Sequence, residues 1–168
     1  MIVELVPHLD AEDRALWRGD DDERPLSDLG RRQARALVSL LARGPIHALF
    51  SSPARRCIET LEPTAAFAGL AVMPLADLRQ RLQGRESTEA LAKRGLNAIE
   101  AAAAESGGRR IIVCSHLDII PAAAELLARK LDLALGRLIS QRGEWYTINL
   151  APGDASIRLN RGPDEFPR

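Results

Sequence analysis

Two of the three histidines in the chain follow directly after apolar runs that have the length of buried strands. His8 comes after residues 2–7, and His116 comes after residues 111–115. A neutral imidazole nitrogen can attack phosphorus and hold the phosphoryl group covalently, which divides one difficult hydrolysis into two easier steps. A second imidazole can donate a hydrogen bond to the phosphoryl oxygens while charge shifts in the transition state. The pair therefore predicts phosphoryl-transfer chemistry, whereas His47 lacks this context and is expected to be structural.

A further predicted strand, 46–50, ends at Ser51 and Ser52 and leads to Arg55 and Arg56 on the first turns of a predicted helix. A guanidinium presents forked donors to phosphoryl oxygens. The start of a helix adds unpaired backbone N–H groups and the positive end of its dipole. A single histidine after a strand is usually structural, but its coincidence with these groups favours catalysis. We expect all four side chains to lie beside a bound anion.

A long polar segment, 9–25, follows the first predicted strand, and long ordered loops in compact domains are usually functional. It contains Trp17 and Arg18, which we assign to substrate binding; for Trp17 the alternative is that it covers the edge of the core. The acidic run 20–23 in the same segment is expected to be a solvated turn.

The elements around these residues alternate between strand and helix patterns, which predicts a three-layer α/β sandwich with a mostly parallel sheet and helices on both faces. Open parallel sheets bind ligands beyond the carboxyl ends of their strands, where the histidines fall. Residues 1–160 are expected to form a single domain and 161–168 a polar tail. The expected strands are 2–6, 46–50, 70–74, 110–115, 144–150 and 155–159, and the expected helices are 27–43, 52–69, 87–105 and 118–131.

Composition excludes several other functions. The 168 residues carry 23 Lys and Arg against 23 Asp and Glu, so bulk charge gives no field that would hold nucleic acid. No run approaches the ~20 apolar residues that a membrane helix needs. Cys57 and Cys114 are too few for a disulfide framework or a zinc site. We expect a soluble cytoplasmic domain. Because no carboxylate cluster lies beside the strand ends, we also expect it to use no metal, and no other cofactor is needed.

Four segments resemble the histidine phosphatase superfamily, also called the phosphoglycerate-mutase-like family. The resemblance is strongest to the small SixA-type phosphohistidine phosphatases and to a related domain that follows a Nudix domain in some actinobacterial proteins. It covers essentially residues 1–150. The segments are Leu5-Val6-Pro7-His8, Arg24-Pro25-Leu26-Ser27-Asp28-Leu29-Gly30, Ser51-Ser52-Pro53-Ala54-Arg55-Arg56-Cys57-Ile58-Glu59-Thr60 and Cys114-Ser115-His116-Leu117-Asp118.

The resemblance implies a role for each matching residue. His8 is the nucleophile that accepts the phosphoryl group, Arg56 is a phosphate clamp and His116 is the second histidine of the pocket. The substrate is then a phosphorylated small molecule or a protein that carries phosphohistidine. A general-acid glutamate is not identifiable in residues 78–83, which is also true of the SixA-type members.

Three positions depart from the family pattern. Pro7 stands where the family has arginine, which removes a charge-assisted bond to phosphate that is worth ~1.5–3 kcal/mol. Leu9 and Leu117 stand where the family has small residues, and both are expected to add bulk at the phosphate entrance. Arginines that could replace the missing charge are Arg14, Arg18 and Arg55.

Two hypotheses follow. The first is a metal-independent phosphatase that works through a phosphohistidine at His8, with Arg56 and His116 stabilising the transferring group. The second is a degenerate histidine phosphatase fold, catalytically weak or inactive, that serves as a binding or regulatory module.

Overall fold

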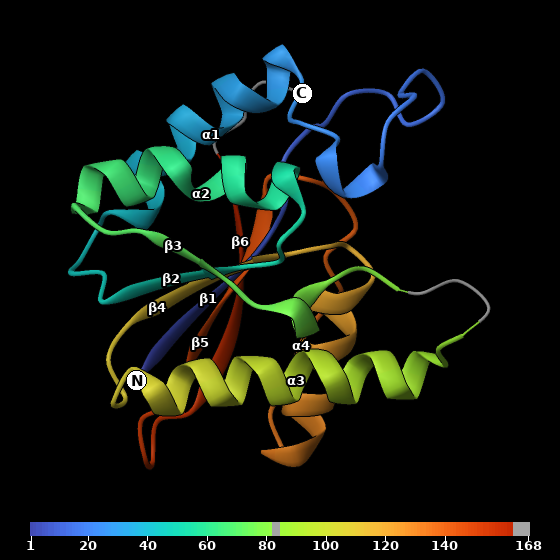
Figure 1. Ribbon diagram of the computed structural model, residues 1–168. Coiled ribbons are helices and arrows are strands. Elements are labelled where there is room, and N and C mark those ends of the chain that lie inside the picture. The colour runs from blue at the N-terminus through green and yellow to red at the C-terminus, as the bar shows by residue number, and fades with distance from the viewer. Residues whose placement is uncertain (82–84, 163–168) are drawn as a thin grey trace.

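The computed structural model describes residues 1–81 and 85–162. They form a six-stranded sheet in the order β3-β2-β4-β1-β5-β6 (Figure 1). The four strands β1 to β4 run parallel to one another, whereas β5 and β6 are antiparallel to their neighbours. The strands are β1 (Ile2–Pro7), β2 (Ala48–Ser51), β3 (Val72–Pro74), β4 (Ile111–Ser115), β5 (Glu144–Asn149) and β6 (Ser156–Arg161).

Two pairs of helices cover the two faces of the sheet. Helices α1 (Asp28–Leu41) and α2 (Arg55–Ala68) pack together on one face, and α3 (Thr88–Glu105) and α4 (Ile119–Lys130) pack together on the other (Figure 1). The predicted three-layer sandwich with a mostly parallel sheet is therefore confirmed.

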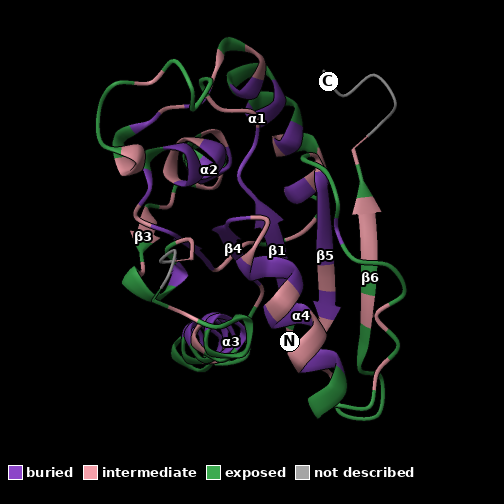
Figure 2. Ribbon diagram, turned by 90° about the vertical axis from the view of Figure 1, so that its right-hand side faces the viewer, coloured by how far each residue is buried: buried purple, intermediate pink, exposed green. Residues whose placement is uncertain are grey.

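The core has one apolar cluster on each side of the sheet, and β1 and β4 contribute to both. Every residue of β4 is buried, as its continuous apolar run predicts for a strand covered on both faces (Figure 2). The outermost strand, β6, is only partly covered. This burial fixes the ends of β1 and β4, and the histidines that follow them, in the most constrained part of the molecule.

Local sequence signals explain where most helices begin and end. Ser27 caps α1 by accepting a hydrogen bond from the Gly30 N–H, and Ser87 caps α3 in the same way. Helix α2 ends at Gly69, which has φ of 67°. The start of α2 differs from the expected one, because the helix begins at Arg55 instead of residue 52 and Ser52 does not cap it. The Ser52 hydroxyl instead contacts His116, and that contact is a property of the site rather than of the helix.

Arg161, where the tail was expected to begin, is still part of β6 and pairs with the buried Glu144. Residues 82–84 and 163–168 lie outside the described residues, and 82 and 83 belong to the segment in which a general acid was sought. The two cysteines are free and buried.

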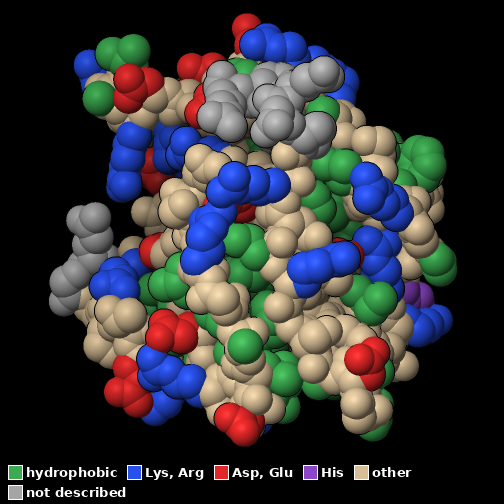
Figure 3. Space-filling view, turned by 180° about the vertical axis from the view of Figure 1, so that it is seen from behind, with side chains coloured by type: hydrophobic (Ala, Val, Ile, Leu, Met, Phe, Trp, Pro, Cys, Tyr) green, Lys and Arg blue, Asp and Glu red, His purple; other side chains and the backbone are tan. Residues whose placement is uncertain are grey.

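No helix within residues 1–81 and 85–162 has the length and apolar character that a membrane span requires. On the face turned away from the viewer in Figure 1, basic and acidic side chains lie interspersed (Figure 3).

Candidate active site

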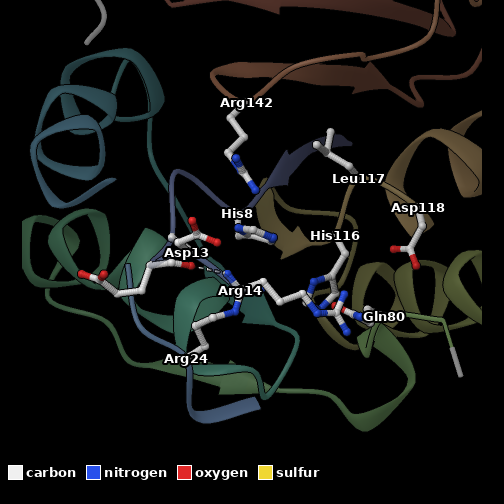
Figure 4. A pocket seen from close by; sticks show the side chains of 11 residues that line it. His8, Asp13, Arg14, Arg24, Gln80, His116, Leu117, Asp118 and Arg142 are labelled. Carbon is white, nitrogen blue, oxygen red and sulfur yellow. Dashed lines mark hydrogen bonds between the residues drawn. The ribbon is translucent and has the colours of Figure 1, made fainter. Parts of the chain in front are cut away.

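A cavity of about 520 Å³ lies at the carboxyl ends of β1 and β4 (Figure 4). Both His8 and His116 line it, as the position of their strands predicts. The cavity is strongly charged, because its lining also includes the three arginines Arg14, Arg24 and Arg142. The acidic residues in the lining are Glu12, Asp13 and Asp118.

His8 is held rigidly by the end of its strand. Pro7 is the last residue of β1 and pairs in register with Ser115 of β4, and the His8 N–H donates to the Ser115 carbonyl at 2.8 Å. The ring is 7% exposed, and its Nδ1 lies 2.8 Å from the Leu9 carbonyl oxygen. Because a carbonyl can only accept, Nδ1 carries the hydrogen and Nε2 keeps its lone pair. This is the tautomer that a nucleophilic histidine needs.

Burial and nearby positive charge keep the His8 ring neutral. Desolvation lowers the pKa of His8 to about 3, with further lowering from the charges of His116, Arg56 and Arg142. The ring therefore has its lone pair available throughout the neutral pH range.

The neutral ring makes the stability of the protein depend on pH. The pKa of His8 is about 3 in the folded state and 6.5 when the chain is unfolded. Between these values the unfolded chain binds more protons, so the free energy of unfolding falls as the pH is lowered from 6.5 towards 3. We expect His8→Gln to flatten this dependence relative to the wild type. Urea unfolding at several pH values measures it, and parallel curves for the two proteins would contradict the assignment.

His116 lies directly across the cavity from His8. The ring centroids are 5.4 Å apart with an interplanar angle of 72°, so a single phosphoryl group can reach both rings. Arg56 Nη2 donates to Nδ1 of His116 at 3.5 Å, and Nε2 lies 2.9 Å from the Ser52 hydroxyl. Since a guanidinium can only donate, a neutral His116 ring carries its hydrogen on Nε2.

Arg56 does not reach the cavity surface in this structure. Its side chain is fully buried, and Nη1 donates to the Asp21 carbonyl at 2.5 Å. Nη2 donates to Gln80 Oε1 at 2.7 Å and lies 3.1 Å from the Asp21 carboxylate. Arg56 Nε is buried without a hydrogen-bond partner among the described residues. The guanidinium thus lies on the side of His116 away from the cavity, and both of its terminal nitrogens already donate to other residues of the protein.

The Asp21 carboxylate is the centre of an arginine cluster, which we call the Asp21 cluster: Asp21 with Arg14, Arg24 and Arg56. It accepts a hydrogen bond from Arg24 Nε at 2.9 Å, and it lies 3.1 Å from Arg56 and 3.6 Å from Arg14. Partial burial raises the pKa of Asp21, but the hydrogen bond from Arg24 and the charge of Arg56 outweigh it and lower the pKa below its ordinary value. The expectation that residues 20–23 form a solvated turn is therefore wrong at Asp21.

The two serines at the end of β2 lie behind the cavity lining. Both are fully buried. The Ser51 hydroxyl donates to the Ser52 carbonyl, and the Ser52 hydroxyl contacts His116 and accepts from the Ala54 N–H. Ser52 therefore orients the second histidine, and Ser51 supports the turn that carries Ser52.

Three other residues that we assigned to substrate binding are not brought to the cavity. Arg55 is half exposed and pairs with Glu59 one helical turn away, because it points outward from the first turn of α2. Arg18 is exposed and donates to the carbonyl of Ala15. The indole N–H of Trp17 donates to the Asp20 carbonyl, so this ring folds back onto its own loop.

The two leucines that depart from the family pattern behave differently from each other. Leu9 is fully buried in the core cluster between the sheet, α1 and α2, so the expectation that it narrows the entrance is wrong. Leu117 does line the cavity. Sequence reasoning missed four residues in or behind the cavity, namely Asp21, Arg24, Gln80 and Arg142. Of these, Arg24 had a sequence signal, because it stands in one of the segments that resemble the family.

Comparisons with known proteins agree with this fold. The model of the histidine phosphatase superfamily (branch 1) matches residues 9–85 and 77–161. An 8-oxo-(d)GTP phosphatase of Mycolicibacterium smegmatis is 27% identical over 157 residues, which is 89% of this chain but 44% of that protein. The chain thus spans less than half the length of this curated relative.

Solved structures share the fold at low sequence identity. YhfR of Bacillus stearothermophilus superposes with a TM-score of 0.75 at 17% identity, over 99% of both chains. The protein histidine phosphatase SixA, solved with tungstate, gives a TM-score of 0.69 at 21% identity, over 96% of this chain and 97% of that one. Together with the family match over most of its length, these findings show that the chain belongs to the histidine phosphatase superfamily.

Proposed function

We propose that this protein is a phosphatase that transfers a phosphoryl group to His8 and then to water. One observation carries the proposal: a buried, neutral His8 has its hydrogen fixed on Nδ1 by the Leu9 carbonyl, in a cavity that it shares with His116. A ring of this form has a free lone pair on Nε2 at neutral pH. The arginines that line the same cavity favour a role in anion binding over a purely structural role for His8.

The proposed reaction has two steps. The lone pair on His8 Nε2 attacks phosphorus, the bond from phosphorus to the leaving group breaks, and the leaving group departs with a proton taken from solvent. A water molecule then attacks phosphorus, the P–N bond breaks, and inorganic phosphate and neutral His8 are regenerated. Positive charge around the cavity stabilises the phosphoryl oxygens in both steps. His116 lies close enough to contact the same group.

We propose that Arg56, Ser52 and His116 act as one unit. Arg56 donates to one ring nitrogen of His116, and Ser52 contacts the other. This arrangement fixes the plane of the second imidazole. We further propose that a bound phosphoryl group displaces the Asp21 carboxylate from Arg56, so that this carboxylate is an internal substitute for substrate.

The substrate is proposed to carry a leaving group that needs little proton assistance. Imidazole leaving from phosphohistidine meets this condition better than an alkoxide does. The relatives include both a protein histidine phosphatase and an 8-oxo-(d)GTP phosphatase. The cavity of about 520 Å³ exceeds the size of a phosphate alone, so it has room for part of the leaving group.

The alternative function, a binding module without turnover, is favoured by the occupation of Arg56 by Asp21 and by the uncharged Pro7 at the end of β1. Such a protein would bind a phosphorylated ligand in the same cavity and release it unchanged. Turnover by purified protein distinguishes the two functions.

The test is a panel of phosphohistidine, a nucleoside triphosphate and p-nitrophenyl phosphate, each assayed with and without EDTA. We expect hydrolysis of the phosphoramidate to be fastest and EDTA to leave every rate unchanged. No cluster of three or more His, Cys, Asp or Glu side chains in residues 1–81 and 85–162 is placed to hold a metal ion. Loss of activity in EDTA that added Mg²⁺ restores would contradict the mechanism, and binding of phosphate with no turnover of any substrate would favour the binding module.

A further inference from the structure

The end of β1 brings no positive charge to the cavity. Pro7, the residue before His8, has a hydrocarbon ring and no N–H donor. A phosphoryl group on His8 Nε2 carries negative charge that must be balanced by side chains reaching the cavity from other elements. The arginines in the cavity lining are therefore the candidates, and their existing contacts decide between them.

Two of the three lining arginines lie beside Asp21. Arg24 is 8% exposed at its side chain, and it donates to the Asp21 carboxylate at 2.9 Å and to the Glu12 carbonyl at 2.8 Å. Arg14 lies 3.6 Å from the same carboxylate, and its side chain is 61% exposed. Arg24 cannot approach His8 without leaving these partners, whereas Arg14 is held, among the described residues, only by this one long contact.

Arg142 is different, because its guanidinium already lies beside His8. It stands in the turn before β5 and extends across the cavity towards the His8 ring (Figure 4). Its charge reaches the ring, where it contributes to the lowered pKa of His8. The contact that holds it is long: Nη1 lies 3.4 Å from Asp10 Oδ1, and the side chain is 40% exposed. A guanidinium held this loosely keeps most of its donors for a ligand.

Asp10 is in turn fixed by the start of α1. Its Oδ2 accepts a hydrogen bond from the Ser27 hydroxyl at 2.5 Å, and its carbonyl accepts from the Ser27 N–H at 3.1 Å. Gly30 lets α1 approach this closely, since a Cβ at that position would lie 1.8 Å from the Asp10 carbonyl oxygen. Asp10 thus offers Arg142 a fixed anchor at the rim of the cavity, on the same loop as His8.

We propose that Arg142 binds the phosphoryl group held at His8 and supplies the positive charge that Pro7 does not. The inference rests on the proposed function, because it assigns a partner to the phosphoryl group of that reaction. Arg142 also explains how a chain with proline before its first histidine keeps a cation at that histidine: the charge comes from the loop before β5 instead of from β1.

The experiment compares Arg142→Ala and Arg142→Lys with the wild type. Inorganic phosphate binding is measured by calorimetry, and turnover of p-nitrophenyl phosphate gives kcat/KM. We expect Arg142→Ala to weaken phosphate binding and lower kcat/KM by about tenfold to a hundredfold, the value of one charge-assisted hydrogen bond. Lysine should recover part of the loss, because it restores the charge without the forked geometry.

Arg35→Ala is the matched control, because it removes the same charge at a position that is exposed on α1 and does not line the cavity. It should leave both measurements unchanged. A second arm adds Pro7→Arg to Arg142→Ala, and recovery of phosphate binding in the double variant would show that the two positions serve one function. If Pro7→Arg impairs folding, as circular dichroism would reveal, the single variants decide.

Phosphate affinity of Arg142→Ala within twofold of the wild type overturns the inference, and so does a wild type that binds no phosphate. The calorimetry is independent of turnover. A protein that binds phosphate through Arg142 but hydrolyses nothing therefore supports the inference while overturning the proposed function.

Discussion

His8→Ala is expected to lower kcat for any substrate of this protein by more than about a thousandfold, the scale of loss when a covalent nucleophile is removed. The covalent phosphohistidine cannot form without Nε2, and no other described side chain combines a free lone pair with this position in the cavity. The measurement is steady-state hydrolysis of p-nitrophenyl phosphate, together with trapping of an acid-labile, alkali-stable phosphoenzyme from labelled substrate.

His47→Ala is the control for loss of a histidine, because His47 lies directly before β2 and does not line the cavity. It should keep full activity. His116→Ala should lose about a hundredfold, as expected for a group that stabilises the transferring phosphoryl without bonding to phosphorus. If His8→Ala keeps wild-type turnover, another group is the nucleophile and the proposed reaction is incorrect.

Asp21→Asn is expected to lower the free energy of unfolding by about 2–4 kcal/mol, which is large for a residue outside the helices and strands of the core. The change leaves the fully buried Arg56 and the nearly buried Arg24 without a counter-ion. The free-energy cost of an unpaired buried charge exceeds the net stabilisation that the ion pair provides. The partial exposure of Asp21 makes the loss smaller than it would be for a fully buried pair. Urea unfolding at neutral pH measures it.

Inorganic phosphate should stabilise Asp21→Asn more than it stabilises the wild type, because a bound anion then takes the position of the missing carboxylate. Asp22→Asn is the matched control: its carboxylate pairs with the exposed Arg79, and such surface pairs contribute about 0–1 kcal/mol. If Asp21→Asn is as stable as Asp22→Asn and gains nothing extra from phosphate, Asp21 does not occupy an anion site.

The sequence predicts the fold well where burial and capping are local properties. The run 111–114 is apolar throughout because β4 is covered on both faces, and Ser27 and Ser87 mark the starts of their helices. The shared cavity of His8 and His116 follows from the same information, since parallel strands that end in histidines bring those residues to one edge of the sheet.

The parts of the site that escaped prediction depend on where loop side chains point. Leu9 and His8 are adjacent, but one side chain enters the core and the other the cavity, which no spacing rule distinguishes outside a regular strand. Asp21 and Arg142 belong to different loops whose folding is set by tertiary contacts. Ser52 has the sequence signature of a helix cap, yet it does not cap α2 and its hydroxyl contacts His116 instead.

The position of β1 has a consequence for how the chain acquires its structure. This first strand lies between β4 and β5, so both of its partners come from the last third of the sequence. Pairings between segments so distant in sequence require closure of long loops, which slows folding. Until β4 or β5 pairs with it, this apolar strand has no neighbour in the sheet and is exposed to aggregation. We therefore expect refolding to be slow and sensitive to protein concentration, with the cavity shared by His8 and His116 among the last features to form.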